Sequence, residues 1–329
     1  FLDATKRMPA WVDMKRVEEG QRVQAVYSSV MGPSLLNGSL VGGSMFKSAA
    51  VVTAQAGNLA DGSSRRVRET AMMVAQLAFP GALKAGAAGH RTFARVRLLH
   101  AGLRYFLPNS GRYTRKDELP INQHDLAITL GLFGWVNVRS LARMGVYLSE
   151  RERENFLHMW RYAAFVMGID EDILPESLAD QAEFFDASCA AEADPDWIPP
   201  QTKVVLDAIA RDVNKDTWNM VSFETAQTFL HQLTRYLSGS QWCTGMQIED
   251  LGDSHWAVRW MWAIGRVTDF MGHRVPFGDE LLARINYMHV RRLMASEHVK
   301  PGEVVGARVG SGVDATAGHK HASGVAPAA

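Results

Sequence analysis

The sequence contains little cysteine and no excess of charge of either sign. Two cysteines, Cys189 and Cys243, occur among 329 residues, which excludes a disulfide framework and a thiolate zinc site. Lysine and arginine together number 35, as do aspartate and glutamate, so the formal net charge is +0. A chain without net positive charge is a poor partner for nucleic acid, so we expect no nucleic-acid ligand.

Long apolar runs and common nucleotide or hydrolase motifs are also missing. The longest strongly apolar run, residues 126–138, is too short to cross a bilayer and contains Gly and Asn, so no transmembrane segment is expected. No Walker loop, Gly-x-Gly-x-x-Gly after a strand, His-Glu-x-x-His or Gly-x-Ser-x-Gly occurs. The chain opens at Phe1 rather than Met, which leaves a cytoplasmic and an exported location both open.

The apolar residues that are present follow helical spacing, and no segment reads as a strand. A hydrophobic content of 47% is enough for a large core. We therefore predict an all-α protein with a single large helical domain over residues 1–298. Residues 299–329 are mostly Gly, Ala, Val and Ser, and are predicted to form a low-complexity, mobile tail.

Gly, Pro, Ser and Asn divide the chain into its predicted helices. Ser149 and Glu152 form a Ser-x-x-Glu capping box for a helix that ends at Gly168. On this helix His158 is predicted to be exposed, whereas Phe133 of the preceding helix is predicted to lie in the core. The predicted helical segments are 23–46 (one or two short helices broken at Gly32-Pro33), 65–79, 91–107, a helix opened by residues 120–125 that runs to about 144, 149–168, 178–193, 202–214, 216–237, 254–271 and 276–294.

The helix predicted at 65–79 carries a stripe that is polar at its start and apolar further along. Arg66, Thr70, Met73 and Leu77 recur at steps of three and four, so they share one face. A pocket wall for a ligand with one charged edge has this pattern.

The helix predicted at 91–107 places Arg97, His100 and Arg104 on one face. Arginines on both sides disfavour protonation of the histidine, and neutral imidazole is the form that binds a metal. The planar guanidinium groups are suited to carboxylates of a bound ligand. An ordinary alternative stays open, because a lone histidine on a half-apolar face is usually a hydrogen-bonded core residue with solvated or salt-bridged arginines beside it.

In order and spacing, four segments of this chain resemble the latex clearing protein and MpaB-type oxygenase family, an all-helical group of haem b proteins. These segments are Pro9-Ala10-Trp11-Val12-Asp13, Arg66-x-x-x-Thr70, Arg97-Leu98-Leu99-His100-Ala101-Gly102-Leu103-Arg104, and the run from Pro120-Ile121-Asn122-Gln123 through Trp160 to Pro175.

The resemblance implies a helical domain around a buried haem pocket, with His100 as the proximal iron ligand. It implies that Arg97 and Arg104 flank that ligand and that Arg66 and Thr70 form a polar pair near the haem. The haem would be held non-covalently, because the chain has no Cys-x-x-Cys-His. Family members use O2 to cleave carbon–carbon double bonds of isoprenoid chains, so the implied partners are O2 and an apolar or isoprenoid substrate. The oligomeric state stays open.

Two positions depart from the latex clearing protein pattern. Glu69 replaces a lysine that can cap the iron, and Ala50 stands where an upstream glutamate is the proposed base. These changes argue against rubber cleavage. We hypothesise that Glu69 is the acid–base group; the alternative is a surface glutamate paired with Arg65 or Arg66.

Three functions therefore remain open from the sequence. The first is a haem b oxygenase for an apolar substrate, with Arg66, Thr70 and Glu69 as the catalytic residues. The second is a haem-binding carrier or sensor without oxygenase activity. The third is a helical binding protein for an apolar ligand that holds no metal.

Overall fold

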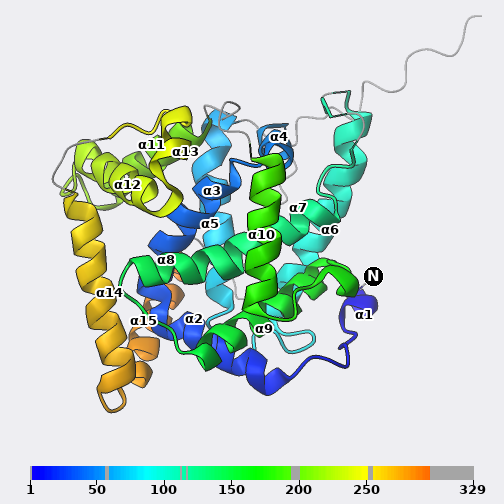
Figure 1. Cartoon of the computed structure of the whole chain (residues 1–329), viewed down its shortest axis with the longest axis horizontal. Coiled ribbons are helices and arrows are strands. Elements are labelled where there is room, and N and C mark those ends of the chain that lie inside the picture. Colours follow the sequence, from blue (N-terminus) through cyan, green and yellow to red (C-terminus); the bar gives the residue numbers. More distant parts are fainter. Residues whose placement is uncertain are drawn as a thin grey trace, which may run out of the picture.

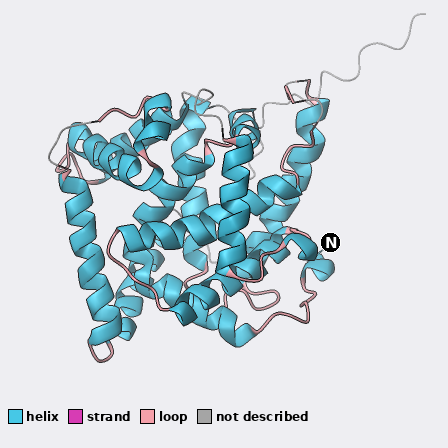
Figure 2. Cartoon of the chain, in the orientation of Figure 1, coloured by secondary structure: helices cyan, strands magenta, loops and turns pink. Residues whose placement is uncertain are grey.

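The computed structural model describes residues 2–55, 59–111, 113–115, 118–193, 201–250 and 255–296. Within these residues every regular element is a helix, and the β pairing is an isolated bridge between Phe46 and Ala193 (Figure 2). The all-α prediction is confirmed. The predicted tail at 299–329 lies outside the described residues, so the proposed domain limit at 298 stays a prediction.

The helical elements lie close to the predicted segments, with differences at their ends. In chain order they are α1 (Leu2–Thr5), α2 (Met14–Ser34), the π-helix η1 (Leu35–Leu40), α3 (Val41–Gly43), α4 (Lys47–Gln55), α5 (Leu59–Gln76), α6 (Ala88–Asn109), α7 (Gln123–Gly131), the π-helix η2 (Leu132–Val136), α8 (Asn137–Arg143), α9 (Glu150–Met167), the 3-10 helix η3 (Glu171–Ile173), α10 (Leu178–Glu192), α11 (Gln201–Asp216), α12 (Phe223–Ser238), α13 (Ser240–Gly245), α14 (Trp256–Arg274) and α15 (Gly278–Ser296) (Figure 1).

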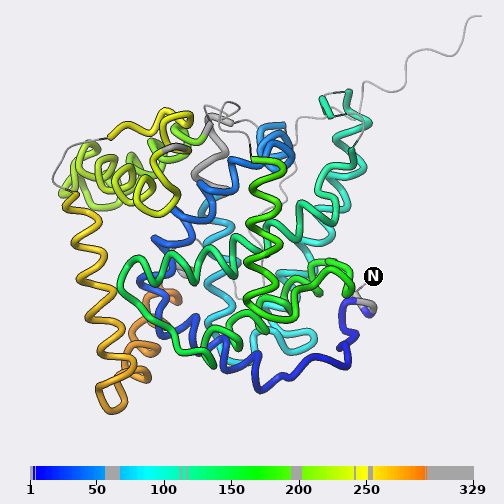
Figure 3. Tube along the Cα trace, viewed as in Figure 1, coloured from blue at the N-terminus to red at the C-terminus, as the bar shows by residue number. Residues whose placement is uncertain are grey.

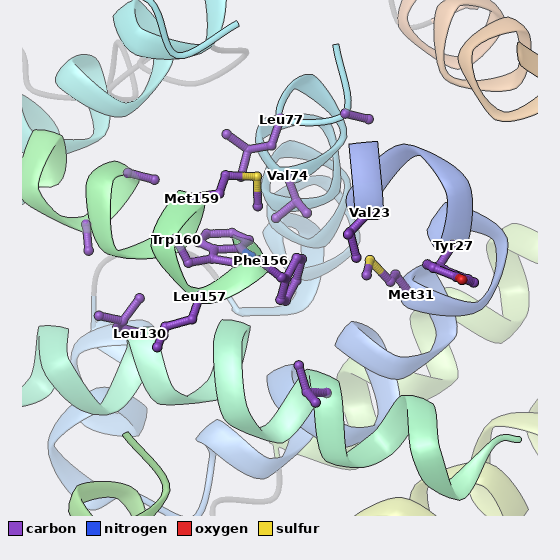
Figure 4. Packing of buried hydrophobic residues seen from close by; sticks show 14 of the residues in the cluster. Val23, Tyr27, Met31, Val74, Leu77, Leu130, Phe156, Leu157, Met159 and Trp160 are labelled. Atoms are coloured by element: carbon purple, nitrogen blue, oxygen red, sulfur yellow. The ribbon is translucent and has the colours of Figure 1, made fainter. Parts of the chain in front are cut away.

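Helices α2 and α9 pack along each other at the centre of the molecule. Trp160 and Phe156 of α9 lie among Val74 of α5 and Val23 and Met31 of α2 (Figure 4). These side chains are almost fully shielded from water, and burial of such large apolar groups stabilises the fold by roughly 1.5–3 kcal/mol each. An apolar helix–helix interface therefore lies at the centre of the fold.

Helix α9 begins and ends as the sequence predicts. Ser149 and Glu152 form the capping box, and Gly168 ends the helix with a left-handed φ of 98°. Phe133 stacks on Trp160 with ring centroids 4.7 Å apart, which confirms its predicted place in the core.

The prediction that His158 is exposed is wrong. The ring is 5% exposed, and its Nε2 accepts a hydrogen bond from the backbone N–H of Asp13 over 3.0 Å. Burial, with the charges of Arg16 and Arg161, lowers the pKa of His158 to about 4. The N-terminal segment covers this side of α9, a long-range contact that helix periodicity does not predict.

The predicted break at Gly32-Pro33 is also wrong. Helix α2 continues through Pro33 and passes directly into the π-helix η1. The side-chain amide of Asn37 donates to the carbonyl of Pro33 over 2.8 Å, and Ser39 Oγ donates to the carbonyl of Leu132 in η2 over 2.7 Å. Side chains thus satisfy carbonyls at the irregular π-helical turns that follow Pro33 and in η2.

Helices α14 and α15 form an antiparallel pair at one edge of the molecule, while α6 lies at the opposite edge (Figures 1 and 3). Helices α11 and α12 pack against each other around a second, smaller apolar cluster. None of the described helices combines the length and the apolarity needed to cross a bilayer.

Candidate functional site

Helices α5 and α6 pack against each other and carry the predicted site residues. Their contact includes a buried hydrogen bond of 2.8 Å from Thr92 Oγ1 to Gln76 Oε1. Thr70 and Glu69 lie on α5, and both are half-buried. The side chain of Arg66 lies outside the described residues, so its predicted place beside Thr70 stays a prediction.

His100 is half-buried in the second half of α6. Its Nδ1 is shielded from solvent and has no hydrogen-bond partner among the described residues. Burial lowers the pKa of His100 to about 4, and the positive charge of Arg104 adds to this effect. The imidazole is therefore neutral at physiological pH, with a shielded nitrogen available to a ligand.

Arg104 is held by the turn that precedes α7. Its Nε donates to the carbonyl of Ile121 over 2.8 Å. Ile121 has a left-handed φ of 55°, which is uncommon for a β-branched residue, and Asn122 with Asp125 then forms the capping box of α7. The strained turn and the cap together set the position of the carbonyl that orients Arg104.

Burial and the neighbouring Arg97 lower the pKa of Arg104, and the carboxylate of Asp125 opposes this shift. A lowered pKa in an arginine means that its charge is incompletely compensated by the surrounding groups. An added anion would stabilise it.

Arg97 lies over the C-terminal end of α9. A methyl group added at Gly168 would lie 2.7 Å from Arg97 Nε, so the glycine leaves room for this guanidinium. Gln123 Nε2 also donates to the carbonyl of Gly168 over 3.1 Å. The C-terminus of a helix carries partial negative charge, which favours a cation at this place. His100 therefore shares its helix face with two arginines that are anchored at different elements.

Glu69 is half-buried, and its Oε1 is shielded from solvent. The side chains of Arg65 and Arg66 lie outside the described residues, so the alternative in which Glu69 pairs with one of them stays open. Ala50 is buried on α4 with 2% of its surface exposed.

Tyr113 is a neighbour of the site that the sequence did not point to. It is 6% exposed and belongs to a small apolar cluster with Leu107 of α6 and Val51 and Val52 of α4. Burial and the charge of Asp125 raise the pKa of its hydroxyl. Its one signal in the sequence is an aromatic residue within a charged loop.

Two cavities of the structure lie away from His100. One cavity of about 230 Å³ lies beside Leu174 and Phe184, and one of about 450 Å³ lies beside Arg139 and Leu148; neither is lined by His100. The described residues contain no group of three or more His, Cys, Asp and Glu that could hold a metal ion. The site offers a single imidazole ligand.

The fold and the site together define a class: an all-helical protein with one shielded, neutral imidazole between two arginines. The chain belongs to the family described as ER-bound oxygenase mpaB/B'/rubber oxygenase, catalytic domain, whose model matches residues 24–269. The matched range runs from α2 to α14 and contains every predicted site residue.

Two particular relatives illustrate this membership. Rubber oxygenase of Streptomyces sp. (strain K30) is 24% identical over 180 residues, which are 53% of this chain and 44% of that protein. The chain therefore matches less than half the length of that relative. The structure of latex clearing protein LCP in the closed state superposes with a TM-score of 0.67 at 16% identity, covering 88% of this chain and 77% of the other. This likeness shows a shared fold.

Proposed function

We propose that this protein is a haem b-dependent oxygenase that uses O2 to cleave a carbon–carbon double bond in an apolar, isoprenoid-like substrate. Membership of the oxygenase family supports the reaction class. The observation that carries the cofactor is the shielded Nδ1 of His100, which has no hydrogen-bond partner among the described residues. A buried nitrogen of this kind ordinarily has a partner, and a metal-bound cofactor beside the ring would supply one.

The residues around His100 fit a haem. The imidazole is already neutral, so no proton has to be removed before it binds iron. Arg97 and Arg104 would hold the propionate groups, because planar guanidinium groups suit carboxylates, and burial with the neighbouring Arg97 lowers the pKa of Arg104, so an added anion would stabilise its charge. When bound, the haem supplies the iron centre for oxygen chemistry, and the protein supplies the axial ligand, orientation and electrostatics.

We propose that Arg66 and Thr70 are the polar pair beside the haem and that Glu69 handles protons. Half-buried Glu69 directly precedes Thr70, so both side chains lie on the same turn of α5. Since Ala50 has no ionisable group, Glu69 would hold or release the proton that the upstream glutamate handles in latex clearing proteins.

Absorption spectroscopy of the purified protein tests the cofactor. The wild type is expected to show a Soret band, and His100→Ala is expected to lose it. An unchanged band in the variant, or no band in the wild type after haem is supplied, would contradict the proposal.

Oxygen uptake with short isoprenoids tests the reaction. Glu69→Gln is expected to reduce turnover by about 10²–10⁴-fold while the haem content stays full. Glu150→Gln, an exposed glutamate at the start of α9, is the matched control and is expected to keep wild-type turnover. Equal rates in both variants would remove Glu69 from the mechanism.

A second function, a haem carrier or sensor, is favoured by one specific observation. Glu69 and the buried Ala50 replace both ionisable residues that latex clearing proteins place near the haem. A full Soret band with no oxygen uptake on any isoprenoid would support this function over the oxygenase.

A further inference from the structure

The outer face of the α14–α15 hairpin carries a concentration of exposed large apolar side chains. On α14 they recur at helical spacing along one stripe, and Phe277 in the connecting turn is 76% exposed. Such a concentration of exposed large apolar side chains ordinarily marks an interaction site. Its exposed members are Trp256, Trp260, Val267, Phe270, Phe277, Leu281, Ile285 and Met288.

The inner face of the same hairpin is firmly attached to the molecule. Asn286 Nδ2 of α15 donates to the carbonyls of Ala25 and Val26 on α2, over 2.8 and 3.0 Å. Asp269 of α14 accepts a hydrogen bond from the backbone N–H of Tyr147 over 2.8 Å. The hairpin therefore presents its apolar face outward from a fixed inner face, and the exposed side chains are not a misplaced core.

The hairpin carries an excess of positive charge. Residues 255–296 contain six arginines, no lysine and three acidic residues, although the whole chain is neutral. Of the three acids only Glu280 is exposed, since Asp279 pairs with Arg22 and Asp269 pairs with Arg266 over 3.1 Å. The arginines at exposed positions are Arg259, Arg274, Arg284, Arg291 and Arg292.

We propose that the outer face of the α14–α15 hairpin docks onto the surface of an anionic phospholipid bilayer, with its helices lying in the plane of the membrane. Tryptophan and other large apolar side chains enter the boundary between headgroups and acyl chains, and arginines beside them contact lipid phosphates. A second copy of the chain fits less well, because two such faces would bring arginine-rich surfaces together. The α14–α15 hairpin and α6 lie at opposite edges of the molecule (Figure 1), so docking leaves α6 uncovered.

Vesicle co-sedimentation of the full chain tests this proposal. The wild type is expected to bind vesicles of phosphatidylcholine with about 30% phosphatidylglycerol, and to bind pure phosphatidylcholine at least about tenfold more weakly. Val267→Glu and Leu281→Glu are each expected to weaken binding to the anionic vesicles by about tenfold or more, because a carboxylate enters the apolar contact and meets lipid phosphates. Both side chains are exposed, so neither change should alter thermal unfolding.

Met8→Glu is the matched control. It makes the same apolar-to-acid change at a residue that is 57% exposed near the N-terminus, away from the hairpin, and it is expected to bind as the wild type does. No binding by the wild type, or equal binding by all three variants, would overturn the proposal. A wild-type dimer in solution that Val267→Glu converts to a monomer, without vesicle binding, would assign the face to a second copy instead and would also overturn it.

Discussion

The two halves of α6 each contain a histidine, and the two histidines differ in the hydrogen-bond partners of their ring nitrogens. In the first turn His90 is 2% exposed, its Nε2 lies 2.8 Å from the carbonyl of Thr5, and its Nδ1 accepts from the backbone N–H of Gly86 over 3.3 Å. Ten residues later His100 has a shielded Nδ1 with no hydrogen-bond partner among the described residues. Both ring nitrogens of His90 are thus paired with backbone groups, whereas Nδ1 of His100 is available to a ligand.

The surroundings of the two halves differ in the same way. Near His90 the helix is buried, whereas the second half exposes apolar side chains at Leu98, Leu99, Tyr105 and Phe106. The same helix therefore stabilises the fold at one end and presents a candidate binding face at the other.

The largest expected effect is at His100. His100→Ala should weaken haem binding by more than about 100-fold, since losses even beyond the direct ligands cost roughly 10–100-fold in metal affinity. Titration of the haem-free protein with haem, followed at the Soret band, measures this change. If the Kd of His100→Ala for haem stays within a factor of about three of the wild-type value, His100 does not differ from His90 in binding haem.

His90→Ala is the reciprocal variant. It leaves the carbonyl of Thr5 and the N–H of Gly86 without their partner, so the free energy of unfolding should fall by about 2–3 kcal/mol while haem affinity is retained. Urea unfolding and the same haem titration separate the two effects. Loss of haem affinity with unchanged stability would reverse the assignment of roles.

The pH dependence of the haem-free protein sharpens the comparison further. The folded-state pKa of His100 is lowered from 6.5 to about 4, so the unfolded chain binds more protons between these values. The free energy of unfolding is therefore highest above about pH 6.5. It falls by roughly 2–3 kcal/mol in total as the pH drops toward 4. His100→Ala should lose this part of the pH dependence in urea unfolding, whereas the part that comes from His158 remains.

The smallest effects concern two glycines. Gly168→Ala places a side chain at a φ of 98° and against Arg97, and should lower the free energy of unfolding by about 1–3 kcal/mol and also weaken haem binding. Gly102 is an exposed residue of α6 with open space where a Cβ would lie. Gly102→Ala should therefore raise the free energy of unfolding by about 0.5–1 kcal/mol. Thermal unfolding of both variants measures the contrast. Equal effects would show that Arg97 does not depend on the cap of α9.

Local signals predicted much of the helical framework. Ser149 and Glu152 cap α9 as predicted, and Gly168 ends it, because capping depends on residues within one turn. The failures were at long range. Pro33 stays within α2, and His158 is covered by a segment that is distant in sequence.

The candidate site was predicted in part. The stripe of Arg97, His100 and Arg104 follows from helix geometry, and all three lie on α6. The sequence did not predict that Arg104 binds the carbonyl of Ile121 or that Arg97 lies over Gly168. These contacts join residues that are 17 and 71 positions apart, and only chain folding brings them together.

The sequence alone determined the helical class, the main caps and the spacing of His100 between two arginines, since each depends on backbone geometry within a few residues. The tertiary structure decided which histidine has its nitrogens satisfied and which apolar stripes stay exposed. Burial, pKa shifts and unsatisfied hydrogen bonds depend on what packs around a side chain, and those neighbours come from distant parts of the chain.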